Sequence, residues 1–234
     1  MTDQSFWFFE EFDLFEMICP TKFSERNDKT QDDKVVKYKK GTNIYIPEEN
    51  ADRIFIIASG RIKIGVYNNN GKEIIKTILD KGEVFGELAM IGQEKRTEFA
   101  YAMEDTVTCV CTMDEMRALM KSNNSLQGYM MSVIGKRVLS VEKRLESLVF
   151  KDSRTRIVEY LIDLVNTRGQ RVGYELLVRK FNTHQEIANL TATSRQTVTT
   201  LLNDLRNKNI LTFDRKRLLV RDIDQLKKEA LAEA

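Results

Sequence analysis

The feature that most constrains the fold is a series of apolar residues within residues 127–148, spaced alternately three and four residues apart. The series is Met131, Ile134, Val138, Val141, Leu145 and Leu148. Apolar residues at these steps lie along one side of an α-helix and form the seam of a coiled coil. Charged residues such as Lys136 and Lys143 stand between them. The pattern predicts a long helix that pairs two copies of the chain; a single helix packed on its own domain is the alternative.

Residues 35–112 follow a different pattern, in which short runs of β-branched and aromatic residues are separated by turn residues. The runs are VVKY, NIYI, RIFIIA, RIKIGVY, EIIKTIL and VTCVC. Between them stand Gly41, Gly60, Gly82 and the pair Asn70-Gly71. Regularly spaced strand-like runs with turn signals predict an all-β roll or barrel. The Asn-Gly pair favours a hairpin turn, because both residues accept positive φ.

Helical patterns occupy most of the rest of the chain. Apolar spacing predicts a short amphipathic helix over residues 5–18. A polar hinge at residues 151–155 precedes a core-facing helix that ends near Arg168-Gly169. Beyond it we expect a strand around residues 176–178, two short helices, a basic hairpin and a tail helix.

The chain offers little for metal or covalent chemistry. Its 3 cysteines are too few for the four ligands of a zinc or iron–sulfur site, and its single histidine, His184, cannot build a multi-histidine site. Cys109 and Cys111 share one face of a predicted strand, where we expect two small reduced core residues. The sequence contains no nucleophile–base pair and no phosphate-binding GxxxxGK motif. We therefore expect no catalytic residues, no metal site and no enzymatic activity.

Charge and hydropathy restrict the partners. The first 150 residues hold 21 Lys+Arg and 24 Asp+Glu, a net charge of −3, whereas residues 151–234 hold 16 and 11, a net charge of +5. A basic C-terminal third favours nucleic acid as its partner. No apolar run reaches the ~18–20 residues that a bilayer-crossing helix needs. Because the acidic, aromatic N-terminus also lacks the basic start of a signal peptide, we expect a cytoplasmic protein with no membrane partner.

Residues 183–210 predict two short helices joined by a tight turn. Thr183 is followed three residues later by Glu186, the pattern of a capping box, and Ser194 can cap the second helix. Two such helices form a helix-turn-helix, whose second helix enters the major groove of DNA. Its outward side chains are of the kinds that read base edges: Arg195, Gln196, Thr199, Thr200 and Asn203. An ordinary helical hairpin is the alternative.

Two flanking segments can contact the DNA backbone. Thr183, His184 and Gln185 open the first helix, and helix N-termini favour phosphates. For His184, a plain surface position is the alternative. Downstream, two strand-like runs flank a basic turn that contains Arg215 and Lys216. This pattern predicts a wing hairpin whose tip lies on backbone phosphates.

Residues 82–97, GEVFGELAMIGQEKRT, indicate a candidate anion site. Gly86 and Glu87 are expected to open a short helix, whose exposed N–H groups favour anions. Arg96 can return to clamp the same anion, and Glu87 can accept hydrogen bonds from sugar hydroxyls. The combination suits a ribose-phosphate ligand. A surface glycine turn with an unrelated arginine is the alternative.

The order of these segments resembles the Crp/Fnr family of regulators, from about Val35 to Val220. The shared features are a strand-rich segment, the GEVFGEL…RT cassette, the seam helix, and a helix-turn-helix with SRQTV and a basic wing. The resemblance implies an α+β chain with an N-terminal cyclic-nucleotide-binding-type β-roll, a long dimerisation helix and a C-terminal winged helix-turn-helix. The implied domains are residues 1–122 for effector sensing, including the N-terminal helix, 123–150 for dimerisation and 151–234 for DNA binding. It also implies a homodimer on a palindromic operator, with RNA polymerase as a further partner.

The cassette residues match the family's effector positions. Gly86, Glu87 and Leu88 match the segment that holds ribose and cyclic phosphate. Arg96 matches the phosphate-binding arginine, and Thr97 matches its hydroxyl neighbour. The resemblance therefore implies a cyclic nucleotide or another small anion as the effector.

The helix-turn-helix matches the family with changes at base-reading positions. Arg195 matches the arginine that reads guanine, whereas Gln196 stands where the family often has Glu. Thr200 stands where cyclic-AMP receptor proteins have a second base-reading Arg, so we expect a different operator. Ala192 stands where the turn usually has Gly, at a cost of roughly 1 kcal/mol if the position needs positive φ.

The seam helix shows the largest departure from cyclic-AMP receptor proteins. Val141-Glu142 replaces the Thr-Ser pair that contacts adenine there from both subunits. Valine can neither donate nor accept a hydrogen bond, which speaks against adenine recognition. Arg137 and Glu142 instead resemble the helix pair of cyanobacterial nitrogen-control regulators, which bind 2-oxoglutarate, although those regulators lack the cassette Glu.

Three hypotheses follow. The first is a homodimeric, sequence-specific transcription regulator controlled by a small anionic effector. The second is a regulator that binds DNA without an effector and keeps a vestigial pocket. The third is a cyclic-nucleotide regulatory subunit that acts on a protein partner through its C-terminal domain.

Overall fold

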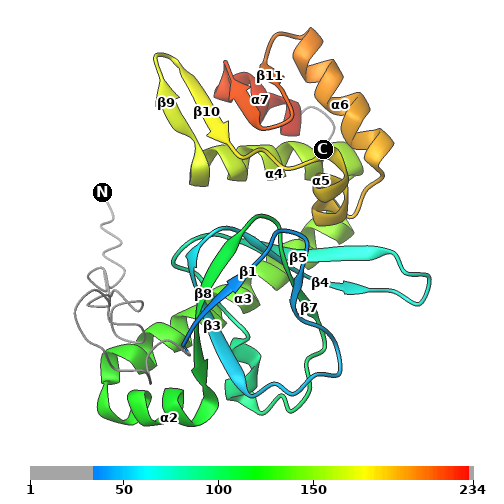
Figure 1. The fold of residues 1–234 in the computed structure, drawn as a ribbon. Coiled ribbons are helices and arrows are strands. Elements are labelled where there is room, and N and C mark those ends of the chain that lie inside the picture. The colour runs from blue at the N-terminus through cyan, green and yellow to red at the C-terminus, as the bar shows by residue number, and fades with distance from the viewer. Residues whose placement is uncertain (1–33, 232–234) are drawn as a thin grey trace. The chain divides into compact units, whose positions relative to one another are not determined.

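The computed structural model describes residues 34–231, so the helix predicted over residues 5–18 lies outside the described residues. The chain forms two compact units, whose boundary falls within one long helix between Leu139 and Ser140. The segment Tyr67–Ile75 groups with the second unit. Each unit has its own hydrophobic core. Figure 1 shows the strands and helices of both units as a ribbon.

The first unit is built on two four-stranded sheets. One has the order β1-β8-β3-β6, formed by β1 (Val35–Tyr38), β8 (Thr106–Thr112), β3 (Arg53–Ser59) and β6 (Val84–Phe85). The other has the order β2-β7-β4-β5, formed by β2 (Asn43–Tyr45), β7 (Phe99–Ala102), β4 (Ile62–Tyr67) and β5 (Glu73–Leu79). Neighbouring strands such as β3 and β8, or β4 and β7, run antiparallel. The β-roll prediction is confirmed: each predicted run forms a strand, and the structure adds β6 and β7.

Aromatic rings from both sheets form the core between them. Phe55 of β3 and Phe85 of β6 stack with ring centroids 4.8 Å apart, and Tyr45 of β2 packs against both rings. Each such buried side chain contributes about 1.5–3 kcal/mol relative to an exposed one. This core fixes the inner wall against which the cassette side chains lie.

The hairpin between β4 and β5 forms where the Asn-Gly pair predicted it. The Gly71 amide donates to the Asn68 carbonyl at 2.9 Å, and the Asn68 amide donates to the Lys72 carbonyl at 3.0 Å. Gly71 has a φ of 74°, whereas Asn70 does not take positive φ. The hairpin prediction is confirmed; the loop has one residue more than a two-residue hairpin, so only its last position is left-handed.

Strand β8 carries Cys109 and Cys111 on the face that packs into the core, as the alternation predicts. Cys111 is a buried free thiol, and burial raises its pKa to about 11. The expectation of two reduced thiols is wrong for Cys109, which is disulfide-bonded. Strand alternation predicts the face on which a residue lies but not whether its thiol is oxidised.

Two helices follow the strands. Helix α2 (Met113–Ser122) begins at a capping box formed by Thr112 and Glu115, and α3 (Asn124–Phe150) contains the whole predicted seam. Ile134 is half-buried, whereas the other seam side chains are 43% to 71% exposed: Met131, Val138, Val141, Leu145 and Leu148. Leu139, Val149 and Phe150 are exposed as well, so the apolar surface is wider than the seam.

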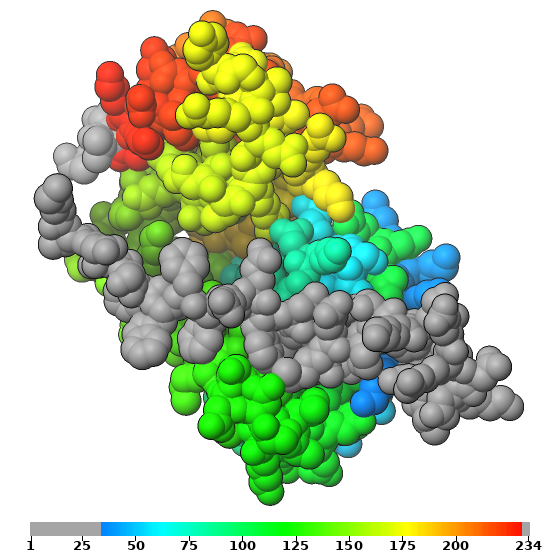
Figure 2. Space-filling view, turned by 90° about the vertical axis from the view of Figure 1, so that its left-hand side faces the viewer, coloured from blue at the N-terminus to red at the C-terminus, as the bar shows by residue number. Residues whose placement is uncertain are grey.

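The second unit combines four helices with a small sheet. The helices are α4 (Ser153–Arg168), α5 (His184–Thr191), α6 (Arg195–Asn207) and α7 (Ile223–Leu231). The sheet has the order β11-β12-β10-β9, formed by β11 (Leu211–Phe213), β12 (Arg217–Val220), β10 (Glu175–Arg179) and β9 (Gln170–Val172). All elements predicted here are confirmed, and β9 is added. The yellow surface in Figure 2 includes the hairpin of β9 and β10, and every residue of β9 is exposed.

The core of the second unit explains these elements. One cluster contains fully buried side chains from three helices: Ile157 and Leu161 of α4, Val198 and Leu202 of α6, and Leu226 of α7.

The predicted polar hinge is shorter than residues 151–155, because the Asp152 side chain accepts from the Thr155 amide and starts α4 at Ser153. Within residues 34–231, no helix combines the length and apolarity needed to cross a bilayer.

Candidate functional site

Arg96 lies inside the β-roll and is only 2% exposed. Its guanidinium stacks over the Tyr45 ring, with the Cζ atom 4.5 Å from the ring centroid. Nη1 donates to the Gly86 carbonyl at 3.1 Å, and Nη2 donates to the Arg53 carbonyl. The buried Nε has no hydrogen-bond partner within the described residues. Because a buried unpaired donor costs about 1–3 kcal/mol, this N–H fits an acceptor supplied by a ligand.

Gly86 makes this placement of Arg96 sterically possible. It has a φ of 77°, a conformation that L side chains rarely adopt. A Cβ atom here would lie 3.0 Å from the Arg53 carbonyl oxygen and 3.1 Å from Arg96 Nη1. The cassette therefore needs glycine at residue 86 for two reasons, backbone conformation and space.

Glu87 is buried and forms an ion pair with α3. Arg137 Nε donates to Glu87 Oε1 at 3.3 Å, and Arg137 Nη2 donates to the Val84 carbonyl at 3.2 Å. Glu87 Oε2 accepts no hydrogen bond from the described residues, so it can accept one from a ligand hydroxyl. The structure thus brings together Gly86, Glu87, Arg96 and Arg137.

Three other predicted effector residues lie farther from this cluster. Leu88 is half-buried in the short 3-10 helix Glu87–Ile91. Thr97 is exposed, and its hydroxyl accepts from Gln93 Nε2 at 2.8 Å. Glu142 is exposed on α3 and makes no ion pair within the described residues. Their roles in binding stay predictions.

Sequence reasoning missed a second buried carboxylate beside Arg96. Glu98 is 8% exposed; its Oε2 accepts from Lys76 Nζ at 2.8 Å, and its Oε1 accepts from the Tyr45 hydroxyl at 3.5 Å. Burial first, and then the charge of Glu98, raise the pKa of Tyr45, which therefore stays protonated. A charged residue two positions after Arg96, just before an apolar strand, was the available signal. The cluster can bind an anion through Arg96 and a hydroxyl group through Glu87.

The helix-turn-helix forms as predicted. Thr183 and Glu186 form the capping box of α5, and the Ser194 side chain accepts from the Thr197 amide at 3.0 Å to cap α6. Ala192 lies in the turn with a φ of 52°, which confirms that this position needs positive φ. The cost of roughly 1 kcal/mol predicted for alanine at residue 192 therefore applies.

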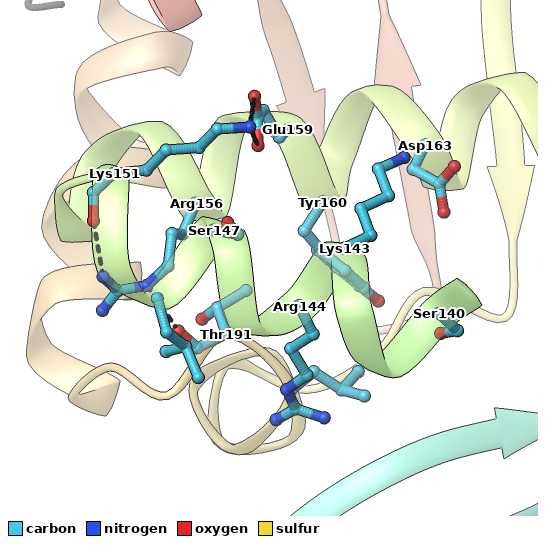
Figure 3. Close-up of a pocket in the computed structure, with 12 residues that line it drawn as sticks. Ser140, Lys143, Arg144, Ser147, Lys151, Arg156, Glu159, Tyr160, Asp163 and Thr191 are labelled. Carbon is cyan, nitrogen blue, oxygen red and sulfur yellow. Dashed lines mark hydrogen bonds and ion pairs between the residues drawn. The ribbon is translucent and has the colours of Figure 1, made fainter. Parts of the chain in front are cut away.

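Arg156 of α4 supports this turn (Figure 3). Its Nε donates to the Thr191 carbonyl at 3.0 Å, and its Nη2 donates to the Ala192 carbonyl at 3.3 Å. Nη1 donates to the Lys151 carbonyl at 2.8 Å. A cation at the C-terminal end of a helix donates hydrogen bonds to the last carbonyl groups and interacts favourably with the helix dipole. Arg156 also lines the shallow pocket drawn in Figure 3, where Lys151 pairs with Glu159 at 2.6 Å.

The outer face of α6 presents unpaired polar side chains. Arg195, Gln196 and Thr200 are exposed and make no side-chain hydrogen bond with the described residues. Thr199 differs, because its hydroxyl donates to the Arg195 carbonyl at 2.9 Å and lies 2.8 Å from His184 Nδ1. The structure therefore places Thr199 against α5 and leaves the other three side chains available to a ligand.

A cleft of about 610 Å³ lies between the start of α5, the start of α6 and the wing. His184 and Arg195 line one part of it, and Arg215 lines the wing part. The Asp214 carboxylate accepts from the amides of Lys216 and Arg217, which shapes the wing tip. Gln185 lines the cleft too, and its Nε2 donates to Asn189 Oδ1 at 2.9 Å. The cleft thus gathers predicted phosphate contacts from three elements.

No group of three or more potential metal ligands occurs in the part of the chain that the structure describes. The two candidate sites are the buried cluster of Glu87 and Arg96 in the first unit and the exposed outer face of α6 in the second.

Two family models match the chain. A cyclic nucleotide-binding domain matches residues 35–123, and a Crp-like helix-turn-helix domain matches residues 155–229. A CRP-like cAMP-activated global transcriptional regulator of Mycobacterium tuberculosis is 28% identical over 195 residues, 83% of this chain and 87% of that protein. A global nitrogen regulator of Nostoc sp. is 27% identical over 188 residues, 80% of this chain and 84% of that protein.

Solved structures agree with this similarity. A CooA mutant from Carboxydothermus hydrogenoformans matches with a TM-score of 0.77 and 26% identity, covering 94% of this chain and 97% of that chain. FixK2 from Bradyrhizobium japonicum matches with a TM-score of 0.73 at 17% identity, covering 83% and 95%, and supports the fold alone. The relatives are transcription regulators and not enzymes. With both domains matched in this order, the chain belongs to the Crp/Fnr family of DNA-binding transcription regulators.

Proposed function

We propose that the protein is a homodimeric, sequence-specific transcription regulator whose β-roll binds a small anionic effector. The observation that carries this proposal is the outer face of α6, where Arg195, Gln196 and Thr200 are exposed and unpaired within the described residues. Arg pairs with guanine and Gln with adenine in the major groove. Side chains of these types on the second helix of a helix-turn-helix match the requirement for base reading.

The apolar surface of α3 supports the homodimer. Val141 and Leu145 are 67% and 62% exposed in the single chain, and a second α3 would cover both. A two-fold dimer places two copies of α6 on half-sites about one helical turn, ~34 Å, apart, which corresponds to a palindromic operator. We assign residues 1–122 to effector sensing, 123–150 to dimerisation and 151–234 to DNA binding. The protein acts in the bacterial cytoplasm, and RNA polymerase is the expected partner for regulation.

The buried Arg96 Nε and the open Glu87 Oε2 support an effector with an anionic group and a hydroxyl group. A cyclic nucleotide has both, and the Mycobacterium tuberculosis relative is named as cAMP-activated. A 2-oxoglutarate-type effector is the second candidate, because Arg137 of α3 already holds Glu87 and can reach an anion beside it. The third possibility is a vestigial pocket that binds no effector.

Selection of bound duplexes from random-sequence DNA tests the DNA-binding proposal. We expect a two-fold symmetric motif with half-site centres ~34 Å apart. Recovery of no motif at moderate salt, with or without candidate effectors, would contradict the proposal and favour a protein partner for the C-terminal domain.

Isothermal calorimetry with cyclic AMP, cyclic GMP and 2-oxoglutarate separates the effector hypotheses. We expect heat from one of them, lost in Arg96→Gln, and a change in operator affinity with the same ligand. Linkage requires DNA to change the effector affinity by the same factor. An absence of heat from all three would favour the vestigial pocket.

A further inference from the structure

A cluster of four charged side chains joins three helices of the second unit. Arg154, near the start of α4, donates from Nη2 to Asp204 Oδ2 at 2.8 Å and also to Glu229 Oε2. Lys208 Nζ donates to Glu229 Oε1 at 2.8 Å and lies 3.5 Å from Asp204 Oδ2. Asp204 belongs to α6 and Glu229 to α7. We call this set of Arg154, Asp204, Lys208 and Glu229 the α6–α7 clamp.

The clamp should hold its helices together more strongly than an ordinary surface ion pair would. The Arg154 and Glu229 side chains are only 29% and 17% exposed, so water screens them less than it screens fully exposed charges. Each carboxylate also meets two cations, and a side chain that is already fixed loses less entropy when it forms a second bond. Leu226 anchors α7 in the core, so Glu229 projects from a fixed helix.

The carboxylates of the clamp stay ionised at neutral pH. The hydrogen bond from Arg154 lowers the pKa of Asp204, and the hydrogen bond from Lys208 lowers the pKa of Glu229. The ion pairs therefore persist wherever DNA binding would be measured.

The clamp reaches the side of α6 that carries the base-reading residues. A groove of about 680 Å³ is lined by Arg154 and Asp204 together with Gln196 and Thr200. A shift of α6 relative to α7 would therefore move Gln196 and Thr200 along with Asp204.

We propose that Arg154 and Glu229 are positioning residues for DNA recognition, and that α7 holds α6 in its reading orientation through the clamp. The inference rests on the proposed reading of DNA by α6. It assigns a role to the tail helix, for which the sequence indicated none.

Charge removal and loss of positioning change the DNA affinity in opposite directions, which allows a test. Glu229→Gln removes a negative charge from a DNA-binding unit, so electrostatics alone would strengthen DNA binding. Loss of positioning would weaken it. Asp224→Asn is the matched control, because Asp224 lies on the same helix, is 79% exposed and pairs only with Lys227 of α7 among the described side chains.

The experiment measures affinity for the duplex selected by the wild-type protein and for a shuffled duplex of the same length. We expect Glu229→Gln to bind the selected duplex about three- to tenfold more weakly and the shuffled duplex as tightly as wild type or more so. Asp224→Asn should bind both at least as tightly as wild type. Arg154→Lys, which keeps the charge but has a shorter reach, should also weaken selective binding. Thermal melting confirms that each variant is folded.

The double variant Arg154→Gln/Asp204→Asn separates positioning from charge screening. If Arg154 only shields the DNA from Asp204, removing both charges restores wild-type affinity. Positioning predicts that the double variant stays weak. Full recovery, or a Glu229→Gln variant that binds the selected duplex as tightly as Asp224→Asn, overturns the proposal.

Hydrogen exchange on the free protein gives a readout that needs no DNA. We expect faster exchange of the α6 amides in Glu229→Gln than in Asp224→Asn, because α6 loses its tie to α7 through Lys208. If the wild type selects no duplex, the DNA-binding function fails, and unchanged α6 exchange would then reject the clamp as well.

Discussion

At the scale of residues, the hydrogen bonds of Thr199 select one tautomer of the neutral His184 ring. The Thr199 hydroxyl donates its one proton to the Arg195 carbonyl, so it must accept from His184 Nδ1 at 2.8 Å. His184 therefore carries its proton on Nδ1, and Nε2 remains an acceptor. Burial first, and then the charge of Arg195, lower the pKa of His184. The ring also packs edge-on against Phe213 of the wing, with Asp214 and Arg215 lining the same cleft.

We predict that His184 titrates below its ordinary pKa of about 6.5 in the free protein. Because the unfolded chain then binds the proton more readily, the free energy of unfolding falls as pH is lowered from about 6.5 through the folded-state pKa. NMR of the chain's single histidine measures this pKa and the tautomer directly. A DNA phosphate near the ring should raise the pKa in the complex. A free-protein pKa above 6.5, or a proton on Nε2 of the neutral ring, would contradict this account.

Gly86 gives a second prediction at this scale. Gly86→Ala introduces both the strain of positive φ and the contacts of a Cβ atom with Arg53 and Arg96. Gly82→Ala is the matched control, because Gly82 has a φ of 88° but nothing within 4 Å of the added atom. Denaturant unfolding should show a loss of about 1 kcal/mol for Gly82→Ala and a larger loss for Gly86→Ala. Equal losses of unfolding free energy in the two variants would mean that the cassette backbone shifts to accommodate the Cβ atom at no cost.

At the scale of elements, the sequence predicts what periodicity and capping determine. The apolar seam predicted α3, runs of β-branched and aromatic residues predicted the long strands, and the Thr183–Glu186 capping box predicted the start of α5. Strands β6, β7 and β9 were missed, because their short sequences VF, FAYA and QRV lack the β-branched runs from which the other strands were predicted. They form because longer neighbouring strands offer them hydrogen-bond partners.

Much of the candidate site depends on pairs that are distant in the sequence. Gly86, Glu87 and Arg96 could be grouped from a local cassette, but the pairing of Glu98 with Lys76 is a product of the folded sheets. The same holds for Arg154 and Glu229, which are separated by 75 residues. Local patterns identify the type of side chain available; only the tertiary fold determines its partner.

The apolar surface of α3 carries the prediction at the element scale. Leu145→Glu places a charge in the middle of the seam, where pairing would bury it. Losing the apolar contact and burying a charge should weaken dimerisation at least about a hundredfold. Sedimentation equilibrium measures the change, and Lys136→Glu, on an exposed position between seam residues, serves as the control. Unchanged dimerisation in Leu145→Glu would place the interface elsewhere.

At the scale of the whole molecule, function requires two units with separate chemistry. The first unit holds the buried cluster proposed to bind an anion, in which Arg137 of α3 contacts Glu87. The second holds the open face of α6. An effector can change DNA binding only by its differential affinity for two states of the protein. Because α3 carries both the Arg137 contact and the dimer seam, the described residues offer one helix through which such states can differ.

The proposed reading of base edges by α6 depends on Arg195, and a titration series checks this dependence. Wild type and Arg195→Ala are titrated against the selected operator and against the operator with each base pair substituted in turn. We expect Arg195→Ala to lose about 1–3 kcal/mol of binding free energy on the selected operator and to become indifferent to the base pair at one position per half-site. A loss that is equal on all duplexes, or no loss at all, would contradict it.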